Sequence, residues 1–326
     1  MFRKLLLAST IAALCACSSD SPAPPTADAA EAPAAAPAAD NTVTSLSGQQ
    51  LTAPASLPRQ AQLEADLAEA RANQAANPDD PDALIWVARR LGYLWRFNEA
   101  IAVLDEGVAR WPDDARIYRH RGHRYITVRD FPRAQADFEK AAQLIAGKPD
   151  EIEPDGAPNP AGIPRTTLAY NIWYHLGLAH YLQGNYAQAL DAYQELLKTS
   201  AADNDDSIVA VTDWMWMSLM RLGRKDEAAA LLEKVTPQMD ILENDSYHRR
   251  LLMYKGLESA DTLLSPESND TTDIATQGYG VANYYLVNGE TEKAKAVLAR
   301  ILEGQGWPAF GYIAAEADMQ RLQAAE

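Results

Sequence analysis

The stretch "WYHLGLAHYLQGNYAQALDAY", residues 173–193, decides the fold of this chain. It places small residues, Gly177 and Ala189, and a large one, Tyr193, at positions where two helices joined by a short turn would touch. The same pattern occurs 55 residues earlier, with Gly122, Ala134 and Phe138 in the corresponding places. The chain therefore contains a repeated helical hairpin.

The spacing between hairpins identifies the kind of repeat. Ala88 and Gly122 are 34 residues apart, and so are Leu104 and Phe138. A period of 34 with small and aromatic residues at these positions resembles the tetratricopeptide repeat family. The resemblance implies an all-α fold, a right-handed superhelical α-solenoid of helical hairpins. We also expect a disordered Ala/Pro-rich linker before this domain.

The repeat pattern divides residues 59–326 into a series of predicted elements. A lone helix is expected at 59–77, a degenerate hairpin at 242–268, and a C-terminal cap at 309–324 that covers the last open face. An insertion at 147–167, rich in proline and acids, is predicted to be a loop. The regular hairpins are expected at 81–114, 115–148, 170–203 and 209–240, with the second helix of another at 288–302.

The N-terminal residues "MFRKLLLASTIAALCACSS" have the pattern of a secretion signal. Two basic residues precede a largely apolar stretch of ten residues, Leu5 to Leu14, which is too short to span a bilayer. The "LCAC" that follows resembles a bacterial lipobox, which implies a signal peptide at 1–16 and a lipid on Cys17. Cleavage before Cys15 and an ordinary secretion signal are the alternatives. Ser18 then favours the outer membrane, with the body facing the periplasm, and residues 17–58 are expected to form the linker.

Composition excludes several classes of function. The formal net charge is -16, so most of the surface should repel nucleic acid. The signal pattern contains both cysteines, so no thiol is left for a disulfide, a nucleophile or a thiolate metal site. No phosphate-binding, nucleotide-binding or serine-hydrolase motif is present. We therefore predict a non-catalytic protein without a cofactor.

One segment carries concentrated positive charge: residues 116–133 hold six arginines, two histidines and one acid. Arg116, Arg119 and His123 lie on one helical stripe, which by the family resemblance faces the concave groove. Arg89 from the preceding hairpin, and Asn171 and Tyr174 from the next, should flank this stripe. Arginine binds carboxylates and phosphates bidentately, so the predicted partner is a protein or peptide with an acidic group.

Two other interpretations of the basic segment stay open. The insertion carries Asp150, Glu151, Glu153 and Asp155, which would neutralise the arginines internally, either permanently or as a displaceable lid. These acids are also candidates for an ion site. A glycan-binding accessory lipoprotein that uses tryptophans, and a metal-dependent hydrolase that uses the groove histidines, are the alternatives to a scaffold.

Overall fold

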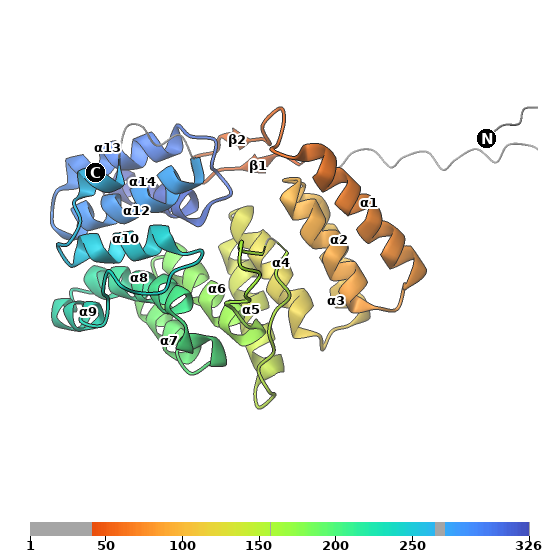
Figure 1. Ribbon diagram of the computed structural model, residues 1–326. Helices are drawn as coiled ribbons and strands as arrows, with labels where there is room; N and C mark the ends of the chain where they lie inside the picture. The colour runs from red at the N-terminus through yellow and green to blue at the C-terminus, as the bar shows by residue number, and fades with distance from the viewer. Residues whose placement is uncertain (1–40, 157, 265–270, 326) are drawn as a thin grey trace, which may run out of the picture. The chain divides into compact units, whose positions relative to one another are not determined.

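The computed structural model describes residues 41–156, 158–264 and 271–325, with the side chains of residues 271–273 excepted, and these residues are predominantly helical (Figure 1). The predicted all-α solenoid of hairpins is confirmed, because most helices pack mainly on their neighbours in the chain; α10, which packs on α8 and α12, is an exception. The helices are α1 (Gln60–Ala76), α2 (Pro81–Tyr93), α3 (Phe97–Arg110), α4 (Ala115–Thr127), α5 (Phe131–Ile145), α6 (Leu168–Leu182), α7 (Tyr186–Leu196), the short 3-10 helix η1 (Ser200–Asp203), α8 (Asp205–Arg221), α9 (Lys225–Leu232), α10 (Asp245–Tyr254), α11 (Ala260–Leu263), α12 (Thr271–Val287), α13 (Thr291–Leu302) and α14 (Phe310–Ala324).

Small residues bring the two helices of each hairpin together as the sequence predicts. A Cβ atom added at Gly177 would lie 2.2 Å from the ring of Tyr193, and one added at Gly122 would lie 2.9 Å from the ring of Phe138. Phe138 and Tyr193 are fully buried. The absence of a side chain on the first helix therefore makes room for the aromatic ring of the second.

The turn inside each hairpin needs one residue with a positive φ. Glycine meets this need at Gly184, Gly223 and Gly289, where φ is between 73° and 81°. In the first two hairpins the corresponding residues are Trp95 and Arg129, with φ of 61° and 68°. This conformation costs a non-glycine residue about 1 kcal/mol or more. Favourable contacts of the two side chains must therefore offset that cost.

Trp95 and Arg129 make these favourable contacts with residues near the C-terminal end of the chain. The rings of Trp95 and Trp307 meet edge to face with centroids 5.0 Å apart. Arg129 forms an ion pair with Glu316 of α14, and both side chains are buried. Helix α14 also packs on α6, α12 and α13, so the predicted cap contacts hairpins from both halves of the array.

The N-terminal part of the described chain corrects one prediction. The linker was expected to reach Pro58, but residues 43–51 form a small antiparallel hairpin, β1 (Val43–Thr44) and β2 (Gln50–Leu51). Val43 and Leu51 are buried in the main core, and Thr52 accepts a hydrogen bond from the indole of Trp307 at 2.9 Å. Strands of two residues are too short to show the alternation that would reveal them in the sequence.

Other differences from the predicted elements are small. Helix α8 begins at Asp205 rather than 209, because Asn204 caps it. The degenerate hairpin at 242–268 consists of α10 and the single turn α11, and its last residues lie outside the described part of the chain. Residues 1–40, which include Cys17, also lie outside it. Among the described residues, we find no helix with the length and apolar character needed to cross a membrane.

Candidate functional site

The basic residues of α4 converge with those of α2 on a pocket of about 150 Å³. Helix α4 begins at its N-cap Asp114 and contains no acidic residue. Its side chains in the pocket are Arg119, His120, His123 and Arg124, whereas α2 contributes Arg89 and Tyr93. The α5–α6 loop adds one carboxylate, that of Glu153. With neutral histidines, three arginines against one glutamate give the pocket a net charge of +2 in a chain of net charge -16.

Arg119 is the most enclosed of these arginines. Its Nε lies 2.9 Å from a carboxylate oxygen of Glu153, and both side chains are about nine-tenths buried. The angle of this contact leaves the Nε hydrogen without a well-aligned acceptor. Burial lowers the pKa of Arg119, and the nearby Glu153 only partly offsets this effect. The ion pair is therefore present but incompletely satisfied.

Arg124 has no carboxylate partner among the described residues. Its guanidinium lies 5.6 Å from the ring centre of Phe97 and fills the space left by Gly92. Burial, followed by repulsion from Arg119, lowers the pKa of Arg124 to about 10. Arg124 is therefore a charged group held in the pocket at a cost in stability, which is the electrostatic character of a binding residue.

The histidines of the pocket are neutral. Burial lowers the pKa of His120, His123 and the adjacent His175 well below the usual value, and the neighbouring arginines lower it further. Arg119 lies 3.3 and 3.4 Å from the Nδ1 atoms of His120 and His123. Because a guanidinium has only donors, both Nδ1 atoms act as acceptors. The histidines thus orient Arg119 and add no charge to the pocket.

Arg89 completes the positive side of the pocket. Its guanidinium lies over the ring of Trp86, 4.3 Å from the ring centre, and donates a 2.7 Å hydrogen bond to the carbonyl of Pro154. Stacking on an aromatic ring holds the guanidinium plane in place while its remaining N–H groups stay available.

Two of the predicted groove residues, Arg116 and Tyr174, lie outside the pocket. Arg116 pairs with Asp114 and Asp82 outside this pocket. Tyr174 is buried in the core, where its hydroxyl contacts Tyr247 and accepts a hydrogen bond from Trp214. His123 lines the pocket, but its ring also packs on His175 and Phe310.

Asn171 contributes indirectly: its amide donates to Glu153 at 3.1 Å. Sequence reasoning missed Arg124, Tyr93 and His120. The available signal for Arg124 was that α4 contains six basic residues and no acid, so any arginine not paired elsewhere is a candidate.

The four acids of the loop have separate roles. Only Glu153 reaches the arginines of the pocket. Asp150 accepts hydrogen bonds from Thr167, from the backbone N–H of Ala169 and from Ser200. Glu151 and Asp155 are exposed. Glu153 is therefore the acid of this loop that pairs with an arginine of the pocket, whereas Glu151 acts on Arg116 outside it.

The residues on which the alternative functions depend are placed differently from what those functions need. Trp307 is 2% exposed and packs edge to face against Trp95, so it offers no open ring face to a sugar. Within the described ranges, histidine, cysteine and acidic side chains do not gather in threes as a metal site would require.

Comparisons with known proteins agree with the repeat. The tetratricopeptide repeat family matches residues 170–200, which contain the first stretch quoted above. Human tetratricopeptide repeat protein 13 is 28% identical over 121 residues, which is 37% of this chain but 12% of that protein. Residues 170–200 therefore form a tetratricopeptide repeat, and the other hairpins of the array follow the same packing pattern. The chain spans only about an eighth of this relative's length.

Solved structures with a similar arrangement of helices share little sequence with this chain. The pilF protein of Pseudomonas aeruginosa is 14% identical with a TM-score of 0.42, and the match covers 82% of this chain and 92% of that one. YrrB, a tetratricopeptide repeat protein with an unusual peptide-binding site, is 16% identical with a TM-score of 0.39, over 77% of this chain and 97% of that one.

Proposed function

We propose that this protein is a non-catalytic, membrane-tethered scaffold that binds a protein or peptide partner carrying an acidic group. The partner's carboxylate binds in the pocket formed by Arg89, Arg119 and Arg124. Repeats of this kind serve as interaction surfaces, and the coarse assignment as an interaction protein follows from the family. The finer assignment depends on the pocket.

The observation that supports it is the unpaired positive charge. Of the three arginines, Arg89 and Arg124 lack a carboxylate partner among the described residues, and the pocket holds a net charge of +2. The half-buried Arg124 has a lowered pKa, so its charge lowers the stability of the fold and is better explained by a ligand than by packing. A carboxylate fits because guanidinium groups bind it through two parallel hydrogen bonds.

Crosslinking in cells followed by mass spectrometry tests this proposal. The wild-type chain is compared with Arg124→Met, which removes the charge but keeps the length of the side chain. Arg133→Met is the matched control, since Arg133 carries the same charge on the neighbouring helix with its side chain 68% exposed. We expect Arg124→Met to lose the captured partner and Arg133→Met to retain it. Equal capture by all three chains would rule out the pocket as the recognition site.

The tether is a separate part of the proposal. The lipobox-like sequence supports a lipid on Cys17, which places the protein at the cell envelope, on the outer membrane and facing the periplasm. Replacing Cys17 with serine should move the protein from the membrane fraction to the soluble fraction. Cys15→Ser is the matched control and should leave it in the membrane fraction. A Cys17→Ser protein that stays with the membrane would contradict the lipid anchor.

A further inference from the structure

Residues 151–156 of the α5–α6 loop, which we call the flap, lie against the basic pocket. Firm anchors hold the loop on both sides of the flap. On one side, Asp150 accepts hydrogen bonds from Thr167 and Ser200 and from the first turn of α6. On the other side, Arg165 pairs with the fully buried Asp206 at 3.2 Å.

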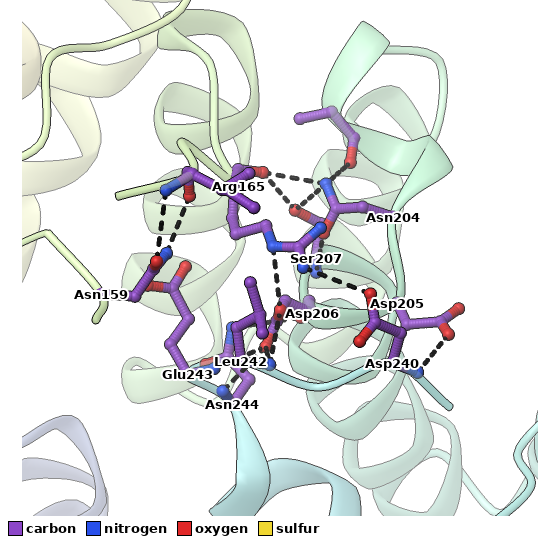
Figure 2. Close-up of polar contacts among 12 residues, drawn as sticks. Asn159, Arg165, Asn204, Asp205, Asp206, Ser207, Asp240, Leu242, Glu243 and Asn244 are labelled. Atoms are coloured by element: carbon purple, nitrogen blue, oxygen red, sulfur yellow. Dashed lines mark hydrogen bonds and ion pairs between the residues drawn. The ribbon is translucent and has the colours of Figure 1, made fainter. Parts of the chain in front are cut away.

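Figure 2 shows this second anchor in detail. The backbone carbonyl of Arg165 accepts hydrogen bonds from Asn204 and Ser207. The Asn159 side chain brackets the backbone of Ile163 by donating to its carbonyl and accepting from its N–H. Asp206 in turn accepts from the backbone N–H groups of residues 242–244. At the start of the flap, the carbonyl of Glu151 accepts a hydrogen bond from the backbone N–H of Leu168, and Ile152 pairs with Thr167, so the movement that leaves the rest of the loop undisturbed is that of residues 153–156.

Between these anchors, a few polar contacts hold the flap on the pocket. Glu153 pairs with Arg119 and accepts from Asn171, while the Pro154 carbonyl accepts from Arg89. Gly156 approaches so closely that an added Cβ would lie 2.0 Å from the Tyr93 hydroxyl. Apolar burial adds little, because Ile152 is 65% exposed. The flap is thus attached as a bound acidic peptide would be, by a carboxylate and a backbone carbonyl on arginines.

We propose that the flap is an internal mimic of the partner. The partner is then an extended acidic peptide segment that takes the place of the flap. The partner's carboxylate replaces that of Glu153 on Arg119 and also binds Arg124. The next backbone carbonyl of the partner replaces that of Pro154 on Arg89. This inference rests on the proposed function, since it assigns the partner to the same pocket.

Replacement is favoured over binding beside the flap for two reasons. Glu153 and the Pro154 carbonyl already occupy the guanidinium groups of Arg119 and Arg89, which a partner's carboxylate and carbonyl would need. The contact between Glu153 and Arg119 also leaves the Nε hydrogen without a well-aligned acceptor, and Glu153 forms no ion pair with Arg124, which has no carboxylate partner among the described residues. A peptide that is free to adjust its position can satisfy both guanidinium groups.

The test uses a capped synthetic peptide with the sequence of residues 150–156, DEIEPDG, and the full chain. Its affinity is measured for wild type, Glu153→Gln and Glu151→Gln. Both variants remove one charge from the flap, but only Glu153 touches the pocket arginines. A glutamine at 153 keeps an oxygen for Arg119, so the fold should persist. We expect Glu153→Gln to bind the peptide at least about tenfold more tightly than wild type and Glu151→Gln to bind it as wild type does.

A second measurement does not depend on any variant. Saturating peptide added to the wild-type chain should release the flap and speed hydrogen exchange at the backbone amides of Glu153, Asp155 and Gly156. A peptide with glutamine in place of its second glutamate should do neither. If the peptide binds Glu153→Gln no better than wild type and leaves these amides unchanged, the flap is not an internal mimic of the partner. The proposed function would survive that result if Arg124→Met still lost the cellular partner.

Discussion

Arg129 and Glu316, 187 residues apart in the sequence, form a bidentate ion pair in the interior of the protein. The Nε and Nη2 atoms of Arg129 donate to the two carboxylate oxygens at 2.9 and 2.8 Å, and the side chains are 3% and 4% exposed. Arg129 adopts a positive φ at the turn between α4 and α5 in order to make this contact. The second hairpin and the C-terminal helix are thereby joined directly.

Breaking this pair should destabilise the fold strongly. Glu316→Ala leaves the buried Arg129 without a carboxylate, with only the carbonyls of Thr127 and Trp307 as acceptors, so we expect a loss of about 3–5 kcal/mol in the free energy of unfolding. Adding Arg129→Gly to Glu316→Ala should recover part of that loss, because glycine accepts the positive φ and removes the unpaired charge. Denaturant unfolding measures both effects. Glu303→Ala, an exposed change, is the control, and a similar loss there would contradict the argument.

Arg124 should be needed for partner binding but not for the stability of the fold. Burial and Arg119 hold its pKa near 10, below the usual value for arginine, so its charge destabilises the folded state. We therefore expect Arg124→Met to keep the stability of wild type or to raise it by up to about 2 kcal/mol, while partner binding is lost. Thermal unfolding and the crosslinking assay give the two measurements. A variant that unfolds at a clearly lower temperature would show that Arg124 stabilises the fold.

Acidification should destabilise the protein through the histidine cluster. The pKa values of His123 and His175 lie well below 6.5 in the folded protein, because burial and the facing arginines Arg119 and Arg124 disfavour their charged forms. The unfolded chain therefore binds protons first. Stability is complete above about pH 6.5 and is lost as the pH falls below it, by up to about 1.4 kcal/mol per pH unit for each histidine.

The matching experiment follows the free energy of unfolding from pH 8 to pH 5. His123→Gln should flatten the decline between pH 6.5 and pH 5 relative to wild type. If the two curves keep the same slope over that range, protonation of His123 is not coupled to unfolding.

The close approach of the two helices within a hairpin predicts which glycine-to-alanine variant loses more stability. A Cβ at Gly177 would lie 2.2 Å from the Tyr193 ring, against 2.9 Å for a Cβ at Gly122 and the Phe138 ring. Gly177→Ala should therefore destabilise the protein by about 2–3 kcal/mol, and Gly122→Ala by less. Thermal unfolding of the two variants decides the order, and the reverse order would show that the third hairpin relaxes more easily than the second.

The sequence predicted the hairpins because their packing is local. Gly177 and Tyr193 are 16 residues apart, and the period of 34 repeats the same contact along the chain. It also located the insertion and the basic segment. It assigned Arg116 rather than Arg124 to the site, because the helical stripe does not show that Asp114 and Asp82 hold Arg116 elsewhere.

What the sequence determined by itself was therefore a repeat of helices that pack on their neighbours, together with the charge that one of those helices carries. Only the tertiary structure decided which charges remain unpaired and which distant segments meet. The contacts of Arg129 with Glu316, of Trp95 with Trp307 and of Glu153 with Arg119 link segments from different repeats or from the insertion. Such contacts depend on the summed rotations of many helices, which no local spacing encodes.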